Sequence, residues 1–177
     1  IKKLKAYTSG GKVNRLRVDM GKAILEPKEI PVVLDGDKVV DRPVEIAGKN
    51  YNITCVSMGN PHCVVFMDDI DNLDIETVGP EFENDKLFPE RVNTEFVTVL
   101  DDHTIKMRVW ERGSGETWAC GTGACAVAVA ACENGFCKKG EDIKIKLKGG
   151  DLIINYTDET VYMTCLLYTS PSPRDMR

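Results

Sequence analysis

Residues 121–134 of the chain read Gly-Thr-Gly-Ala-Cys-Ala-Val-Ala-Val-Ala-Ala-Cys-Glu-Asn, and Gly135 follows them. From Ala124 to Ala131 the side chains are small and apolar all around a helix, so such a helix must be enclosed by other elements. Asn134 and Gly135 supply the left-handed residue at which helices end. The stretch therefore predicts a buried central helix that begins beside Cys120.

Most of the remaining sequence consists of short alternating segments between turn signals, which is typical of antiparallel strands. The expected strands are 13–20, 39–46, 51–56, 63–67, 93–100, 104–110, 143–148, 151–156 and 161–164. A second helix is expected over residues 74–84, where Ile75, Val78 and Phe82 recur at helical spacing. We therefore expect an α+β fold in which antiparallel strands wrap around the apolar helix.

Length and composition restrict the class of protein. The 177 residues are 42% hydrophobic and 29% charged, and their formal net charge is -5. A mildly acidic chain without a clustered basic face does not suit a nucleic-acid surface. The longest apolar run of the predicted helix, 124–132, is far shorter than the ~20 residues of a membrane-spanning helix. We therefore expect neither nucleic acid nor a membrane as a partner.

The seven cysteines include no Cys-X-X-Cys pair. Their odd number and spacing suit free thiols in a reducing cytoplasm better than a disulfide framework or a zinc site. Cys125 and Cys132 are expected to fill the core beside the helix, and Cys55 and Cys63 to be buried in strands. His103 lies in a polar turn and is expected to be solvated.

Cys120 differs from the other six because it stands at the N-terminus of the predicted central helix. Unpaired N–H groups and the positive end of the helix dipole should lower the pKa of a thiol there, so we expect Cys120 to ionise most readily. The amides of Gly121 and Thr122 would bind a carboxylate. A thiolate beside that carboxylate suits proton abstraction at the adjacent carbon. The alternative is an inert cysteine at the start of a buried helix.

Other polar residues could reach the same place. Glu111 and Arg112 end a strand, where Arg112 could bind a second carboxylate and Glu111 an ammonium group; alternatively, they form a surface ion pair. Asn60 and His62 lie in a turn between two strands, and Asn93 opens another strand. Each could contact a ligand, but Asn60 could equally cap its turn, His62 could be structural, and Asn93 could be an ordinary strand-start residue.

Three motifs are informative together: Met58-Gly59-Asn60-Pro61-His62, Arg91-Val92-Asn93-Thr94-Glu95-Phe96 and the run from Glu111 to Gly123. Their order and spacing resemble the diaminopimelate epimerase family over about residues 5–164. The resemblance implies one half of a pseudo-symmetric two-domain fold with its site in the cleft between the halves. It also implies a homodimer that interconverts LL- and meso-diaminopimelate, an amino-acid substrate of bacterial lysine and cell-wall precursor biosynthesis, with no metal, pyridoxal phosphate or other cofactor.

By this resemblance Cys120 is one of two catalytic thiols on opposite faces of the α-carbon. One thiolate removes the proton and the opposite thiol returns one, as inversion through a planar carbanion requires. Gly121 and Thr122 would bind the carboxylate at the reacting carbon.

The resemblance gives the remaining polar residues two further roles. Glu111 would bind an ammonium group and, together with His62, would tune the thiols. The far end of the substrate would be held by Asn60, Asn93 and Arg112.

The chain departs from the family pattern at both ends. The family's first cysteine, in a Cys-Gly-Asn-Gly context, is absent, and the chain begins without Met. Residues 1–20 resemble the closing strands of a truncated N-terminal domain, and 21–165 correspond to the C-terminal epimerase domain. Residues 166–177 are rich in Ser and Pro, so we expect a disordered tail foreign to the family. We expect this chain alone to lack epimerase activity.

Other functions are compatible with parts of the pattern. A proline racemase-like or phenazine-type isomerase of the same fold is one alternative, and a non-catalytic binding domain is another. Asn60, Asn93 and the pair Glu111-Arg112 suit a second amino-acid head group, and this favours diaminopimelate over the substrates of the two related isomerases. A redox or zinc protein is the least favoured reading.

Overall fold

The structure is a computed structural model that describes residues 3–166. Its strands and helices are, in chain order, β1 (Leu4–Ser9), β2 (Lys12–Gly21), the 3-10 helix η1 (Pro27–Glu29), β3 (Arg42–Ile46), β4 (Lys49–Ser57), β5 (Pro61–Phe66), α1 (Ile75–Glu83), β6 (Asn93–Asp101), β7 (Thr104–Glu111), β8 (Gly115–Thr117), α2 (Gly121–Glu133), β9 (Asp142–Leu147), β10 (Gly150–Tyr156) and β11 (Val161–Leu166).

The described strands form one curved sheet. Their order is β1-β2-β11-β10-β9-β7-β6-β5-β4-β3, and β8 pairs with β7 beside this path. Most neighbours are antiparallel, but β5 pairs in parallel with β6, and β7 with β9. The predicted α+β class is confirmed, and the two parallel pairs are an addition to the antiparallel strands that were expected. Each parallel pair is joined by a crossover that contains a helix, α1 in the first and α2 in the second, as parallel pairing requires.

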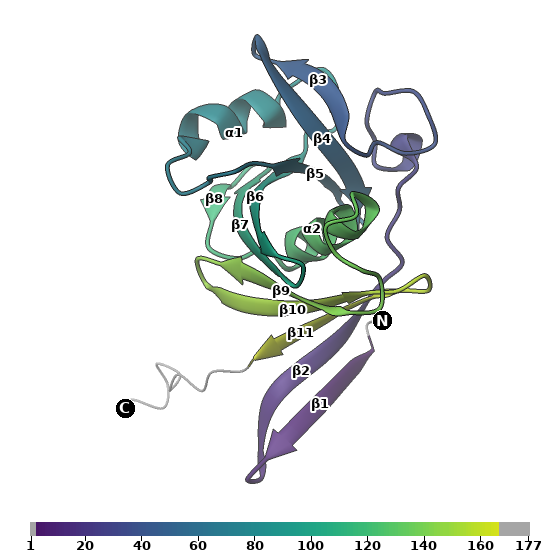
Figure 1. The fold of residues 1–177 in the computed structure, drawn as a ribbon, viewed down its shortest axis with the longest axis vertical. Helices are drawn as coiled ribbons and strands as arrows, with labels where there is room; N and C mark the ends of the chain where they lie inside the picture. Colours follow the sequence, from purple (N-terminus) through teal and green to yellow (C-terminus); the bar gives the residue numbers. More distant parts are fainter. Residues whose placement is uncertain (1–2, 167–177) are drawn as a thin grey trace.

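Helix α2 lies in the concavity of the sheet, with strands around it (Figure 1). Its residues from Gly123 to Ala131 are buried, and it contacts β4, β5, β6, β9, β10 and β11. Cys125 is fully buried, whereas Cys132 in the last turn is only partly buried. Gly135, with φ of +79°, provides the left-handed residue beyond the helix. The prediction of an enclosed central helix is confirmed.

Helix α1 covers the opposite face of the sheet. Asp74 caps it by accepting a hydrogen bond from the Thr77 amide at 3.3 Å. On its buried side, Phe82 meets the ring of Phe96 edge-on, with 5.4 Å between the ring centroids. Because alternate residues of a strand face opposite sides, Phe96 of β6 packs toward α1 and Val97 toward α2. The sheet thus separates two hydrophobic cores.

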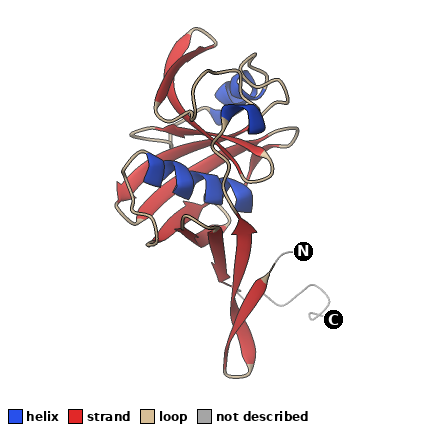
Figure 2. Cartoon of the chain, turned by 90° about the vertical axis from the view of Figure 1, so that its right-hand side faces the viewer, coloured by secondary structure: helices blue, strands red, loops and turns tan. Residues whose placement is uncertain are grey.

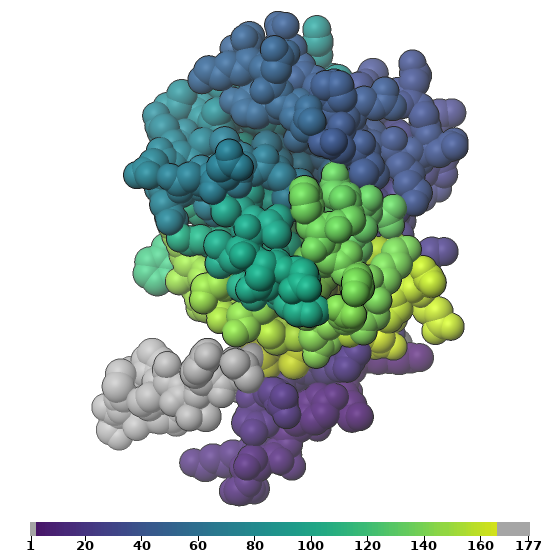
Figure 3. All heavy atoms as spheres, in the orientation of Figure 1, coloured from purple at the N-terminus to yellow at the C-terminus, as the bar shows by residue number. Residues whose placement is uncertain are grey.

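The hairpin β1–β2 projects away from the body (Figures 2 and 3). Strand β2 pairs with β11 from Arg15 to Gly21, so it continues the sheet that surrounds α2. The assignment of residues 1–20 to a separate domain stays a prediction. Strand β11 extends the expected 161–164 segment to Leu166, and most of the expected tail, 167–177, lies outside the described residues.

Three details of the secondary structure differ from the strands expected, the first being β1, which is not among them. Strand β3 begins at Arg42 rather than at residue 39, because Val39 instead accepts a backbone hydrogen bond from Cys55 at 2.9 Å. The short strand β8 was expected to be loop; it pairs with the end of β7 after a tight turn. Neither described helix is long and apolar enough to span a membrane.

Gly79 of α1 allows the helix to lie directly on Trp110 of β7. A Cβ atom at position 79 would overlap the Trp110 ring. We therefore expect Gly79→Ala to lower the free energy of unfolding by about 1–3 kcal/mol, because overpacking outweighs the helix propensity of alanine. Urea unfolding of the two proteins measures this difference.

The control is the same substitution in a Trp110→Leu background. With the ring removed, Gly79→Ala should cost much less, so the two changes should be strongly non-additive. Equal costs in both backgrounds would contradict the proposed contact.

Candidate active site

Cys120 is the N-cap residue of α2. Its backbone is extended (φ -133°, ψ 106°), and its Sγ accepts a hydrogen bond from the Gly123 amide at 3.3 Å. The side chain is largely buried, while the preceding Trp118 is 74% exposed. The amides of Gly121 and Thr122, in the first turn, have no intrahelical acceptors. This end of α2 therefore presents a thiol and free amides close to solvent.

A chain of polar side chains leads from Cys120 into the protein. Sγ lies 3.6 Å from Thr122 Oγ1, which accepts a hydrogen bond from Asn60 Nδ2 at 3.3 Å. Asn60 Oδ1 lies 3.1 Å from His62 Nε2, and His62 Nδ1 lies 2.6 Å from Glu95 Oε1. Four of the predicted site residues are thus brought together, and Glu95 ends the chain.

The direction of these hydrogen bonds follows from the amide of Asn60. Because its NH₂ group donates to Thr122, its Oδ1 faces His62 and must accept from an Nε2–H group. The Thr122 hydroxyl already accepts from Asn60, so its own proton is free to point toward Cys120 Sγ. The arrangement therefore offers a second donor, besides the Gly123 amide, to a thiolate at position 120.

Glu95 is a site residue that the sequence analysis did not select. Its side chain and that of His62 are both 0% exposed. Burial raises the pKa of the Glu95 carboxyl, although the His62 contact opposes this shift. The alternation of side chains along the strand could have indicated it. Glu95 lies on the same face of the strand as Val97, which packs on α2, and a carboxyl group in such a core needs a partner.

Gly123 makes room for this carboxyl. A Cβ atom at position 123 would lie 2.6 Å from Glu95 Oε1, 3.1 Å from Cys120 Sγ and 3.2 Å from Met107 Cε. Gly121 is less confined, since its nearest neighbour would be the flexible end of Met163 at 3.2 Å. The absence of a side chain at Gly123 therefore allows α2 to pack closely against β6.

The pKa of Cys120 differs from expectation. Burial, followed by the charge of Glu95, raises it to about 11, and Glu111 adds to the shift. The hydrogen bonds from Thr122 and Gly123 oppose the shift but do not overcome it. The expectation of a lowered pKa is wrong, because desolvation and two carboxylates outweigh the helix N-terminus. In the described structure Cys120 is a thiol at neutral pH.

Asn93, Glu111 and Arg112 form a second group at the end of β7. Asn93 is buried and bridges strands: its Nδ2 donates to the Pro61 carbonyl at 3.0 Å, and its Oδ1 accepts from the Arg112 amide at 3.0 Å. Arg112 Nη1 donates to the Glu90 carbonyl at 2.9 Å. Glu111 and Arg112 do not pair with each other, so the alternative of a surface ion pair is wrong.

Glu111 is partly buried, and its Oε1 accepts a hydrogen bond from Thr117 Oγ1 of β8 at 2.5 Å. The strand β8, which the sequence did not predict, thus orients the carboxylate. Because Glu111 acts on the pKa of both Cys120 and Glu95, it belongs to the same electrostatic site.

Glu83, at the end of α1, holds the turn that carries Glu111. Its carboxylate accepts hydrogen bonds from Trp110 Nε1 at 2.7 Å, the Gly113 amide at 2.8 Å and Arg91 Nη1 at 2.9 Å. Two of the donors come from the end of β7 and the turn after it, and the third, Arg91, lies just before β6. Glu83 falls within the helix predicted over residues 74–84, and nothing in the local sequence indicates these partners.

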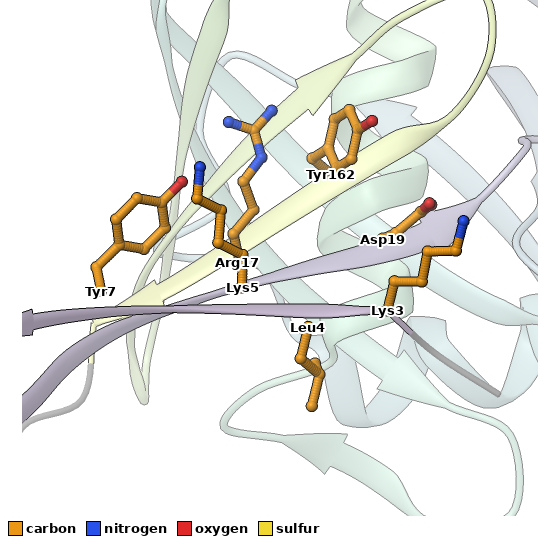
Figure 4. Close-up of a pocket in the computed structure, with 7 residues that line it drawn as sticks. All are labelled: Lys3, Leu4, Lys5, Tyr7, Arg17, Asp19 and Tyr162. Atoms are coloured by element: carbon orange, nitrogen blue, oxygen red, sulfur yellow. The ribbon is translucent and has the colours of Figure 1, made fainter.

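The remaining expectations concern residues away from the site. Cys55 and Cys63 are buried as register partners on β4 and β5, and His103 is half-exposed. Cys55, Cys63, Cys120, Cys132 and Cys137 are free thiols. A hollow of about 410 Å³ lies on the β1–β2 hairpin and β11 (Figure 4). It contains none of the predicted site residues and is lined by Lys3, Leu4, Lys5, Tyr7, Arg17, Asp19 and Tyr162.

Known proteins resemble this chain in sequence. A family model described as diaminopimelate epimerase matches residues 54–166. The diaminopimelate epimerase of Agathobacter rectalis is 50% identical over 173 residues, which cover 93% of this chain and 60% of that protein. The diaminopimelate epimerase of Acetivibrio thermocellus is 51% identical over 166 residues, with 93% and 59% covered. The chain therefore spans about three-fifths of the length of these relatives.

Solved structures agree on the fold. A probable proline racemase from Agrobacterium radiobacter K84 matches 98% of this chain and 58% of its own, with a TM-score of 0.67 at 15% identity. A hydroxyproline epimerase from Agrobacterium vitis matches 92% and 53%, with a TM-score of 0.65 at 13% identity. The architecture is thus that of racemases and epimerases, and the sequence match is more specific: this chain belongs to the diaminopimelate epimerase family.

Proposed function

We propose that this chain supplies one of the two catalytic thiols of an enzyme that interconverts LL- and meso-diaminopimelate. Membership of the family supports the substrate. The observation that carries the proposal is the position of Cys120 Sγ at the N-terminus of α2, joined through Thr122 and Asn60 to His62. The second thiol would belong to the part of the relatives' length that this chain does not span.

The chemistry requires two proton carriers on opposite faces of one carbon. A thiolate on one face takes the α-proton, which breaks the C–H bond and leaves a planar carbanion beside the carboxylate. Cys120 then gives its S–H proton to the other face, so a new C–H bond forms with inverted configuration. The resulting Cys120 thiolate would be stabilised by the Gly123 amide and the Thr122 hydroxyl. In the reverse direction the same thiolate is the base.

The substrate would be held through its charged groups. The amides of Gly121 and Thr122 would bind the carboxylate at the reacting carbon, where the helix dipole also favours the charge that develops in the carbanion. Glu111 would bind an ammonium group and, with His62, tune the thiols.

The far end of the substrate would lie against Asn60, Asn93 and Arg112. Arg112 suits a carboxylate because its guanidinium group has five N–H donors, and Nη1 already anchors it to the Glu90 carbonyl. The Asn93 amide bonds to two backbone groups, so we assign it chiefly the task of placing Arg112.

We further propose a cytoplasmic homodimer that needs no cofactor and has neither nucleic acid nor a membrane as a partner. The free thiols of Cys55, Cys63, Cys120, Cys132 and Cys137 support a reducing compartment. The net charge of -5 is unsuited to a nucleic-acid surface.

Cys120 should be required for exchange of the α-proton. A complete enzyme can be made by joining residues 1–166 to the portion of the Acetivibrio thermocellus relative that they do not match. In heavy water we expect it to incorporate deuterium at the α-carbon of diaminopimelate, and we expect Cys120→Ala to reduce this incorporation by at least ~10³-fold, since one of the two proton carriers is lost. Mass spectrometry measures the incorporation.

The matched control is Cys132→Ala, at the other end of α2, which should keep near-normal exchange. Proline and hydroxyproline, tested alongside, distinguish the sister isomerases. The 177-residue chain alone should show no turnover. Exchange on proline rather than diaminopimelate, or a Cys120→Ala enzyme with normal exchange, would contradict the proposal.

Gly123→Ala should impair the site without unfolding the protein. The added methyl group would press on Glu95 Oε1 and Cys120 Sγ. A displacement of reacting atoms by about 1 Å can reduce turnover roughly 10²-fold. We therefore expect kcat of the joined enzyme to fall by that order while circular dichroism stays unchanged. A variant with normal kcat would show that Cys120 needs no such placement.

A further inference from the structure

Glu95 and Cys120 approach each other across a single glycine. Glu95 Oε1 and Cys120 Sγ lie 2.6 Å and 3.1 Å from the point that a Gly123 Cβ atom would occupy. Glu95 comes from β6 and Cys120 from the start of α2, so the contact depends on the packing of helix against sheet. A fully buried carboxyl group therefore lies behind the proposed catalytic thiol.

Glu95 has little around it to neutralise a negative charge. Its Oε1 meets His62 Nδ1, and its Oε2 has no hydrogen-bond partner among the described residues. The side chain is completely buried, so water does not screen it. Any negative charge on Glu95 is therefore screened less from its neighbours than a charge at the protein surface would be.

At the position of Cys120, a positive charge on His62 would compensate a negative charge on Glu95 only in part. Its imidazole reaches Sγ through two intervening side chains, Asn60 and Thr122, whereas Glu95 lies directly behind Gly123. If the pair is an imidazolium and a carboxylate, its negative end is therefore the one that faces the thiol.

The other groups around Cys120 are few. Glu111 of β7 adds a second negative charge, while the Thr122 hydroxyl and the Gly123 amide favour the thiolate. On the other side of the pair, Cys63 of β5 is buried and lies within the field of Glu95.

We propose that Glu95 is a positioning residue that keeps Cys120 in the thiol form, so that Cys120 enters the reaction as the proton donor. This inference rests on the proposed function, in which two thiols face one α-carbon. One of the two must begin as a thiol and the other as a thiolate. By disfavouring a negative charge on Cys120, Glu95 would make Cys120 the thiol and the opposite cysteine the thiolate. The free enzyme would thus be biased toward one of its two protonation states.

The test is the pH dependence of Cys120 alkylation in the full 177-residue chain. Iodoacetamide is suitable because it is uncharged, and peptide mass spectrometry reads each cysteine separately. In the wild type we expect slow alkylation of Cys120 with an inflection at about 11. Glu95→Gln should lower the inflection by about one pH unit and raise the rate at pH 8 about threefold, since the gain in thiolate exceeds the loss in its nucleophilicity.

A second variant and a matched control protect this test from effects on folding. Glu95→Met removes the charge without supplying any hydrogen bond, and should shift Cys120 in the same direction. Glu133→Gln removes a carboxylate at the other end of α2 and should leave Cys120 unchanged. It should instead accelerate Cys132, whose pKa Glu133 helps to raise.

Acceleration of Cys120 in both Glu95 variants, with unchanged rates at Cys132 and Cys137 and unchanged circular dichroism, is the expected result; Cys63 also lies within the field of Glu95 and is left out of this comparison. A Cys120 rate that stays within about twofold of the wild type or falls would overturn the proposal. Equal acceleration of Cys132 and Cys137, whose pKa values Glu95 does not influence, would overturn it too. The measurement uses no substrate, so its failure leaves the proposed epimerisation to be judged by α-proton exchange.

Discussion

The hydrogen bond between His62 and Glu95 is the constraint on which the site depends. It joins β5 to β6, which run in parallel, and it is sealed from water on the α2 side of the sheet. Because both side chains are fully buried, neither can exchange its partner for solvent, and an unpaired one would be costly. The pair thereby fixes the imidazole, the imidazole fixes Asn60, and Asn60 fixes the hydroxyl of Thr122 beside the thiol.

The same packing that builds the site also decides its electrostatics. An N-cap position with a free amide ordinarily stabilises a thiolate. Here the apolar helix must be enclosed to be stable, so its first residue is drawn into the protein and against Glu95. Desolvation and the two carboxylates then outweigh the helix N-terminus, and the pKa of Cys120 rises. The same packing therefore both buries the helix and raises the pKa of the Cys120 thiol.

Much of this could be predicted from the sequence, because the signals were local. The run from Ala124 to Ala131 has no polar face, so an enclosed helix was the only stable outcome. Alternation and turns located the strands, and the motifs around His62 and Cys120 located the site. The local pattern could not predict which distant segments lie next to each other. These include the parallel pairs of β5 with β6 and of β7 with β9, and the approach of Glu95 to Gly123. The error on the pKa of Cys120 follows from that last omission.

Nuclear magnetic resonance of the ring nitrogens tests the buried pair most directly. The chain has only two histidines, so labelling with ¹⁵N-histidine gives two sets of signals. His103 is 51% exposed and provides the internal reference for a solvated ring. We expect His62 to show an Nε2-bound proton that exchanges slowly with water and an Nδ1 that is hydrogen-bonded to the carboxyl of Glu95. A His62 ring without a proton on Nε2, or one whose protons exchange as fast as those of His103, would contradict the proposed arrangement.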